Sequence, residues 1–380
     1  MEFHPCFAIL NRAFLYMAIR IPNLSKLASI EVSSFFKKTP PKTQGERKVG
    51  LNIGHGAITA CEVSFGAQHQ LILEQCARKE IVKDKPIASQ LKDFLHESKF
   101  QSKQVNMSLK GHGVVVRFLS FPKMNRSDFA SSIQFEAEKY LPFSLSEVVL
   151  DYQIIEDIAV PPKTDLNTMK VILVAARKTE IDKLVNLAQE IGFKLNVIDV
   201  DVFAYVNAFE HSNPEVKNQS VALIDFGAGD TTLAVVDKGA LVFSRDIAFG
   251  GDDLTEMIHR KLNVPVEEAL KIQLDQNLSQ PEHKIAVEEG LSRLFQELRS
   301  SLNFYYNQNQ TATPVETIYV SGGLSQLGVL LELLEKQIET PIKKWDPTSQ
   351  FTLGEKVSRE TLDPLTPYLP VCIGLAIRSK

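Results

Sequence analysis

Apolar and polar positions follow two different periods along this chain. From Val49 onward, short apolar runs of strand character, most of them closed by glycine, alternate with segments of helical spacing such as 85–98 and 127–140. Strands that alternate with helices along a chain are typical of α/β proteins, in which the helices cover the sheets. The pattern therefore predicts an α/β fold for the chain after residue 48.

A long-range repeat divides this region into two related halves. Residues 49–59 and 222–232 both read as an apolar strand with Asn52 or Asp225 near its end, a Gly-x-Gly turn, and a second strand that carries threonine. Their separation far exceeds the roughly 20–50 residues of solenoid repeats. Each half is therefore predicted to open with a strand, a glycine turn and a strand.

The paired turns indicate a site for a polyphosphate. Glycine tolerates positive φ and has no Cβ, so a Gly-x-Gly turn can point backbone N–H groups into a concavity that accepts an anion. One such turn is usually an ordinary hairpin, but two facing turns would hold phosphates from both sides. Asp225 ends an apolar strand, where a carboxylate is costly unless paired. It is predicted to face a water-bound Mg²⁺; the alternative is that it accepts hydrogen bonds from its own turn.

Two further glycine pairs lie where helices are expected to begin. The apolar run 318–320 ends in Ser321-Gly322-Gly323 before a helix with leucines on one face, and Gly250-Gly251 opens another helical pattern. A glycine pair between a strand and a helix lets a flat ring and a sugar lie against the backbone. The alternative is a plain tight turn.

The helical pattern at 127–140 has its own candidate core. Phe129, Ile133, Phe135 or Glu136, and Tyr140 fall at near-helical spacing and are predicted to lie mostly in the core. Pro142 is expected to stop this helix.

Composition narrows the class of protein. The 380 residues are 44% hydrophobic and 23% charged, as in ordinary globular proteins. A net charge of −4 lacks the basic footprint of nucleic-acid binding, so no nucleic-acid partner is expected. The cysteines and histidines show no metal-ligand spacing, and no segment approaches the roughly 20 apolar residues that span a bilayer. A reduced, cytoplasmic chain without structural zinc is predicted.

The first 48 residues differ from the rest and end in the breaker-rich Thr39-Pro40-Pro41-Lys42. They are predicted to form an extension and linker. Phe35 and Phe36 beside two lysines would suit a membrane surface, although a tether is the simpler interpretation. Translation from Met17 is a further alternative.

At this point the motifs resemble those of the actin, Hsp70 and sugar-kinase superfamily. The two turns are similar to its phosphate motifs, and 320–323 is similar to its adenosine motif. Within the superfamily, the chain resembles the PilM family of type IV pilus assembly proteins over about residues 36–380, and FtsA of cell division more distantly. The PilM likeness rests on connected segments at 115–118, 121–124, 136–143, 150–153, 174–178, 197–204, 243–245, 250–251 and 374–378.

The resemblance implies an actin-like (duplicated ribonuclease H-like) ATPase fold with two lobes and an inserted SHS2-type subdomain. The implied division is an extension at 1–48, the first part of lobe I at 49–110, the inserted subdomain at 111–197, the return of lobe I at 198–219, and lobe II at 220–380 with its own subdomain at about 252–315.

The resemblance also implies an ATP and Mg²⁺ site. Asp225 would act at the metal through water and in hydrolysis. The nucleotide would contact residues of all four glycine motifs: Asn52, Gly54, His55, Gly56, Ala57, Thr59, Gly227, Ala228, Gly229, Asp230, Thr231, Thr232, Gly250, Gly251, Ser321, Gly322, Gly323 and Leu324. Two departures weaken this site, so any ATPase activity is expected to be slow. Asn52 replaces an acidic residue, and Ala269-Leu270 with Gln273 stand where relatives place Ala-Glu and a lysine for the ribose.

What the family implies in function is a scaffold of the type IV pilus assembly platform. PilM-like proteins sit at the cytoplasmic face of the inner membrane and hold the N-terminal peptide of PilN in a groove involving the inserted subdomain. Contact with the membrane would be made through partners, which extend to other platform proteins and the assembly ATPase.

Three alternatives remain open. A small-molecule kinase of the same superfamily needs a catalytic base between the lobes, for which Asp225 is the candidate. An FtsA-like protein would carry a C-terminal amphipathic helix, where this chain ends in Arg378-Ser379-Lys380. The cytoplasmic part of a type II secretion protein would continue into a transmembrane helix.

Overall fold

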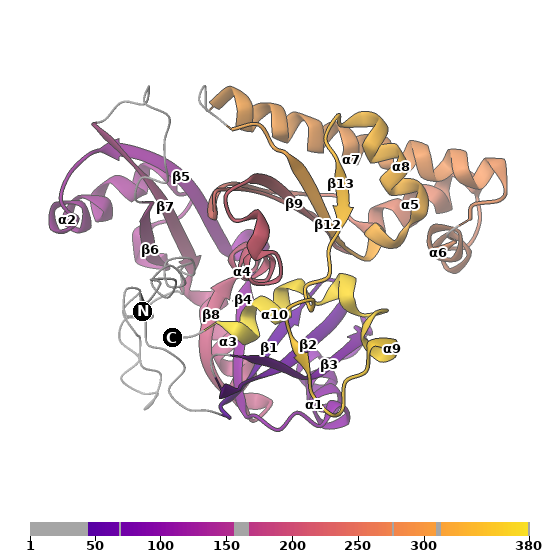
Figure 1. Cartoon of the computed structure of the whole chain (residues 1–380), viewed down its shortest axis with the longest axis horizontal. Helices are drawn as coiled ribbons and strands as arrows, with labels where there is room; N and C mark the ends of the chain where they lie inside the picture. Colours follow the sequence, from indigo (N-terminus) through magenta and orange to yellow (C-terminus); the bar gives the residue numbers. More distant parts are fainter. Residues whose placement is uncertain (1–44, 68–69, 156–166, 276, 309–312, 379–380) are drawn as a thin grey trace, which may run out of the picture.

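The computed structural model describes residues 45–67, 70–155, 167–275, 277–308 and 313–378 (Figure 1). Almost all of the predicted N-terminal extension, including Met17 and Cys6, lies outside the described residues. Within the described part, no helix is long and apolar enough to cross a membrane.

The first sheet contains six strands in the order β14-β3-β2-β1-β4-β8. An antiparallel meander, β1 (Arg47–Ile53), β2 (Ala57–Phe65) and β3 (Leu71–Glu80), continues into β4 (Gln104–Leu109) and β8 (Lys194–Val200), which run parallel to β1. Apolar side chains of α1 (Ile87–Ser98) and α3 (Lys178–Glu190) pack in one hydrophobic cluster with β1 and β4, and those of α4 (Asp201–Ser212) and α10 (Pro370–Ile377) pack in another. The sheet is therefore covered by helices, as the alternating pattern predicts.

The second sheet repeats the topology of the first. Its order is β11-β10-β9-β12-β13, with an antiparallel meander of β9 (Ser220–Phe226), β10 (Thr231–Asp237) and β11 (Ala240–Ile247) followed by the parallel β12 (Thr317–Gly322) and β13 (Ile342–Lys344). Its hydrophobic cluster takes in α5 (Gly251–Leu262), α6 (Val266–Leu274), α7 (Pro281–Gln308) and α8 (Gly328–Gln337). The predicted duplication is confirmed.

A third, smaller sheet projects from the first lobe (Figure 1). It has the antiparallel order β5-β7-β6, with β5 (Val114–Pro122), β7 (Thr168–Arg177) and β6 (Val148–Ile155). Helix α2 (Arg126–Glu136) begins at Asn125, whose side chain accepts a hydrogen bond from the Asp128 N–H at 2.9 Å, and it buries Phe129 and Ile133 against the sheet.

The core prediction for this segment is confirmed at Phe129 and Ile133 and is wrong at two residues. Phe135 in α2 is 79% exposed, and Tyr140 in the turn after α2 is 37% exposed. The buried stripe continues from Phe129 and Ile133 to Ala137, because residues four apart lie on the same helix face. Phe135 falls outside that stripe.

Two of the implied boundaries also need correction. Strand β8 lies in the first sheet although it begins inside the segment assigned to the insertion. The chain after β13 returns from the second lobe to the first, where β14 (Thr352–Leu353) pairs with β3 and α10 packs against β1 and α4. All residues of α10 up to Ala376 are buried. A helix this apolar needs partners on every side, and the first sheet together with α4 provides them.

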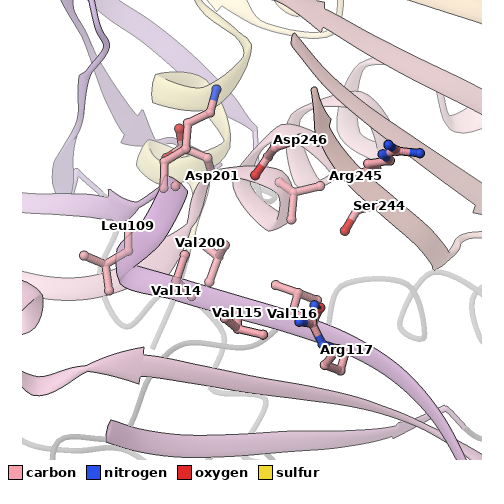
Figure 2. Close-up of a pocket in the computed structure, with 13 residues that line it drawn as sticks. Leu109, Val114, Val115, Val116, Arg117, Val200, Asp201, Ser244, Arg245 and Asp246 are labelled. Carbon is pink, nitrogen blue, oxygen red and sulfur yellow. The ribbon is translucent and has the colours of Figure 1, made fainter. Parts of the chain in front are cut away.

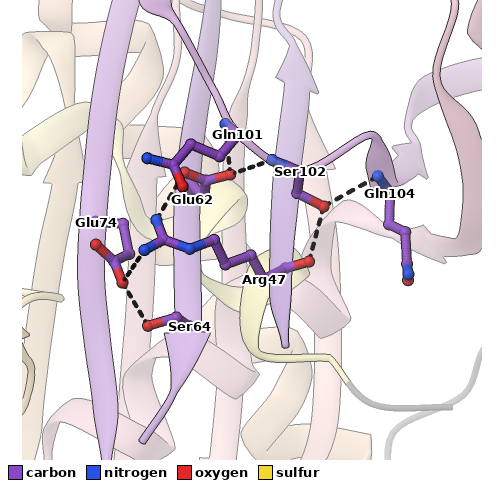
Figure 3. Close-up of polar contacts among 7 residues, drawn as sticks. All are labelled: Arg47, Glu62, Ser64, Glu74, Gln101, Ser102 and Gln104. Atoms are coloured by element: carbon purple, nitrogen blue, oxygen red, sulfur yellow. Dashed lines mark hydrogen bonds and ion pairs between the residues drawn. The ribbon is translucent and has the colours of Figure 1, made fainter. Parts of the chain in front are cut away.

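A polar network ties the start of β4 to the meander (Figure 3). Glu62 is 2% exposed, and its Oε1 accepts hydrogen bonds from the backbone N–H groups of Gln101 and Ser102 at 2.9 and 2.6 Å. Arg47 forms ion pairs with Glu62 and Glu74 at 3.5 and 3.0 Å. These contacts anchor the loop that precedes β4. The opposite end of β4 leads to Lys110, a residue of the site described next.

Candidate functional site

The site lies where the parallel strands of both sheets end. In α/β folds, ligands bind beyond the carboxyl ends of parallel strands. Here Lys110 follows β4, Asp201 follows β8, and Asp225 and Ser321 sit at adjacent positions near the ends of the paired strands β9 and β12. Side chains from both lobes therefore converge on one region.

The two Gly-x-Gly turns face one another, as predicted. The turn 54–56 joins β1 to β2, and the turn 227–230 joins β9 to β10. A Cβ added to Gly229 would lie 2.7 Å from the His55 ring, and one added to Gly56 would lie 3.2 Å from the Ala228 side chain. The turns are thus close enough to contact a common ligand.

Helix α5 begins against the second turn. The N–H of Gly251 donates to the carbonyl of Gly227 at 3.0 Å, and that of Asp252 donates to Ala228 at 2.9 Å. A Cβ on Gly250 would lie only 2.2 Å from the Ala228 oxygen, so only glycine permits this approach. Gly250 and Gly251 therefore bring the positive end of a helix dipole to the turn.

Several predicted ligand residues have protein partners in the structure. The Thr231 hydroxyl donates to the Phe249 carbonyl, and that of Thr232 donates to Asp246 Oδ1, each at 2.8 Å. Leu324 is buried in the second core, and the ring of Tyr368 lies 3.3 Å from a Cβ placed on Gly323. These residues shape the site through packing.

A charged cluster spans the two lobes. The Lys110 ammonium contacts Asp230 Oδ1 at 2.7 Å. Burial raises the pKa of Asp201 to about 6 despite the nearby Lys110, and burial also raises the pKa of Asp225. Burial opposes the charge of Lys110, but Asp201, Asp230 and Asp225 outweigh it, so the pKa of Lys110 lies above its usual value.

The sequence interpretation missed Lys110 and Asp201. Both directly follow an apolar strand, where the same reasoning that selected Asp225 would have selected them. Nothing in the local pattern shows that these two strand ends meet the second lobe.

Asp225 has a neutral partner as well. The Tyr205 hydroxyl and Ser321 Oγ are 2.8 Å apart, and Ser321 donates to Asp225 Oδ1 at 3.0 Å. The chain of contacts runs from α4 through β12 to β9. Asp225 therefore does more than accept hydrogen bonds from its own turn.

The residues around Asp225 do not form a set of metal ligands. Among the described residues, no three His, Cys, Asp or Glu side chains are grouped so that they could hold a metal ion. The carboxylates face the Lys110 ammonium instead. The predicted Mg²⁺, which Asp225 would contact through water, stays a prediction.

Gln273 and Leu270, which stand where the resemblance implies residues for the ribose, lie in different environments. Gln273 is buried and its Oε1 accepts the Thr255 hydroxyl, whereas Leu270 is 44% exposed. A Cβ on Gly251 would lie 3.2 Å from the Gln273 amide nitrogen. The glutamine therefore packs beside the start of α5.

A pocket opens beside the charged cluster, between β5 and β11 (Figure 2). Its volume is about 240 Å³. Lys110 and Asp201 line it, so the pocket shares residues with the charged cluster. Its remaining lining comes from the two strand ends in the first lobe, from 114–117 of β5 and from 244–246 of β11.

Comparison with known proteins relates this architecture to others. A family model described as "Type IV pilus assembly protein PilM" matches residues 50–380. The chain is similar to a solved PilM–PilN type IV pilus biogenesis complex, with a TM-score of 0.76 and 26% identity, covering 87% of this chain and 98% of that chain. The ethanolamine utilization protein EutJ from Carboxydothermus hydrogenoformans has a TM-score of 0.50 at 14% identity, covering 90% of this chain and 92% of that one, and shares the fold alone.

A shorter match is to the cell division protein FtsA from Bacillus subtilis (strain 168). It is 33% identical over 100 residues, which make up 26% of this chain and 22% of FtsA. The fold matches confirm the predicted actin-like architecture.

Proposed function

Because this chain belongs to the PilM family of type IV pilus assembly proteins, we propose that it is a nucleotide-binding scaffold that holds the N-terminal peptide of a PilN-type protein at the cytoplasmic face of the inner membrane. The observation that carries the proposal is the pocket between β5 and β11. It adjoins the inserted sheet, and the similar solved complex contains PilN beside PilM.

Two sheet edges make this pocket suitable for an extended peptide. In the described part of the chain, β5 is the outer strand of the three-stranded sheet and β11 is the outer strand of the second sheet. An outer strand leaves one row of backbone N–H and C=O groups without a strand partner. An added peptide can satisfy such groups, while pockets select its side chains.

The size and lining of the pocket favour an anchoring side chain. Its volume of about 240 Å³ lies below the roughly 300–1,000 Å³ of sites that enclose whole small molecules. Val115 is half-buried in its wall, and Arg117 and Arg245 also line it (Figure 2). Lys110, Asp201 and Asp246 add further charged groups to the lining. An anchoring residue would therefore pack its apolar atoms on the valines of the wall and present polar atoms to these charges.

The test is a titration of a labelled PilN-type N-terminal peptide against the full chain. We expect micromolar binding, about −8 kcal/mol. Val115→Glu places a charge in the pocket wall and should weaken binding at least tenfold. Val266→Glu is the matched control, because Val266 is 47% exposed on α6, away from the pocket. Binding that is not saturable, or that weakens equally in both variants, would refute this site.

The nucleotide half of the proposal rests on the facing glycine turns. The turns and the start of α5 supply backbone dipoles, and His55, Asp230 and Lys110 supply polar side chains around one cleft. We expect ATP to stabilise the protein by about 2.7 kcal/mol at a hundredfold excess over Kd. Gly229→Val would drive a side chain into the His55 ring and should abolish the thermal shift. An identical shift in parent and variant would place the nucleotide elsewhere.

A further inference from the structure

We propose that Lys110 is the resident cation of this cleft and binds the phosphates of the nucleotide in place of a divalent metal ion. The inference rests on the nucleotide half of the proposed function. It identifies the residue that supplies positive charge at the site and predicts how binding depends on metal.

The position of Lys110 carries the first step. The residue follows β4 in the first lobe, and its ammonium reaches Asp230 of the second glycine turn at 2.7 Å. The contact therefore joins the two lobes. Both side chains keep partial access to solvent, at 28% and 31% exposed, so an incoming anion can reach the ammonium.

The charges around Lys110 carry the second step. Asp201, Asp230 and Asp225 all act on its ammonium. These acids are not grouped as a set of metal ligands within the described part of the chain, and their negative charge already faces the Lys110 ammonium. Mg²⁺ requires a near-octahedral shell of oxygen ligands, and a fixed positive charge in the same cluster opposes its entry.

The first turn carries the third step. Asn52, at the end of β1, is neutral where an acid would help to hold a metal ion. The missing acid lowers the affinity of this region for a metal ion, and the lysine supplies positive charge that the metal would otherwise provide. A lysine ammonium is a point charge with three donors and is well suited to phosphate oxygens.

Binding of phosphate would then involve an exchange of partners. Lys110 leaves Asp230, and the phosphate oxygens take the place of the carboxylate. Asp230 therefore competes with the nucleotide for the ammonium. Removing the charge of Asp230 should strengthen metal-free binding, whereas removing the charge of Lys110 should weaken it.

The experiment is calorimetric titration of ADP into the full chain, in buffer with Mg²⁺ and in buffer with EDTA. For the parent we expect affinities within about tenfold of each other in the two buffers. Lys110→Met keeps the aliphatic stem and should lose more than tenfold in EDTA. Lys194→Met is the matched control, because Lys194 is exposed at the opposite end of β8 from Asp201, and it should behave like the parent.

Asp230→Asn is a second, independent variant, so the test does not depend on whether Lys110→Met folds. The backbone bond from the Gly227 N–H to the Asp230 carbonyl is unaffected by the substitution. We expect at least a threefold gain of ADP affinity in EDTA.

Three results would overturn the inference: a parent that loses more than tenfold in EDTA, a Lys110→Met variant that binds ADP like the parent in EDTA, or no gain in Asp230→Asn. Absence of ADP binding in both buffers would remove the inference together with the nucleotide half of the proposed function. Peptide binding measured on the same sample would show whether the scaffold half still stands.

Discussion

The ion pair between Asp199 and Arg378 allows a direct test of how the C-terminal segment stabilises the first lobe. Asp199 is fully buried at the end of β8, and its Oδ2 lies 3.2 Å from the Arg378 Nε just after α10. The contact is ionic and is not aligned as a hydrogen bond. Asp199 Oδ1 accepts the Val200 N–H at 2.9 Å. The pair links the returning C-terminal helix to the sheet.

The perturbation is Arg378→Leu, which leaves the carboxylate buried and without a counter-ion. Burial already raises the pKa of Asp199 from 3.8 to about 6 although Arg378 lowers it. At about 1.4 kcal/mol per pKa unit, the charged form therefore already costs about 3 kcal/mol. Breaking a buried pair typically costs about 3–5 kcal/mol, and we expect a loss of stability in that range near neutral pH.

The pH dependence has a definite sign. The folded-state pKa of Asp199 lies above the unfolded value, so the native state binds the extra proton. The contribution of this group is favourable below about pH 4 and is lost as the pH rises through about 6. Without Arg378 the pKa rises further. The destabilisation of Arg378→Leu relative to the parent should therefore be large at neutral pH and shrink by about pH 5.

The assay is urea unfolding of the parent, Arg378→Leu, Asp199→Asn and the double variant, at neutral pH and near pH 5. The double variant should be more stable than the sum of the single effects predicts, because it contains no buried charge. A cost below about 1 kcal/mol for Arg378→Leu would refute the reasoning, since it lies well under the range for broken buried pairs. So would a destabilisation that does not change with pH.

Three further predictions concern packing and the first turn. Gly50→Ala would place a Cβ 1.9 Å from a carbonyl oxygen of α10 and should lower the free energy of unfolding by about 1–3 kcal/mol, measured with denaturant. Gly66→Ala is the control and should cost far less, because its Cβ would have its nearest contact at 3.4 Å. Equal effects of the two substitutions would contradict the close packing of α10. Glu62→Leu removes the acceptor of two backbone N–H groups and should lower stability by about 1–3 kcal/mol. Glu97→Leu, at an exposed position, is the control and should cost less than about 0.5 kcal/mol. Similar melting temperatures for the two variants would argue against a stabilising role of the Glu62 network. Asn52→Asp places an acid at the first turn and should make ATP turnover or nucleotide affinity more dependent on Mg²⁺. Colorimetric phosphate release measures the turnover, and calorimetry measures the affinity. No change in either quantity would show that Asn52 does not limit metal binding.

The sequence by itself determined the local elements and their duplication. Val49 and Ala222 each begin an apolar run that ends in a glycine turn, and both runs form the strand that pairs with its hairpin partner and with a parallel neighbour. A glycine in the sequence indicates such a turn because it allows a backbone conformation, or a close approach of another segment, that other residues do not allow. Gly322 shows the same constraint, because its φ is 84° and a Cβ added there would lie 2.3 Å from the Phe226 backbone.

Only the tertiary structure decided which of these elements meet. The apolar pattern of α10 predicts that it is buried, and the same pattern would fit either lobe, because periodicity reports burial and not the identity of the neighbour. The return of α10 to β1, the exposure of Phe135 and the meeting of Lys110 with Asp230 all depend on such long-range choices. The sequence places Lys110 after an apolar strand and Asp230 in a glycine turn, but nothing along the chain shows that these two residues meet. The two lobes bring their side chains to 2.7 Å, where the opposite charges attract each other.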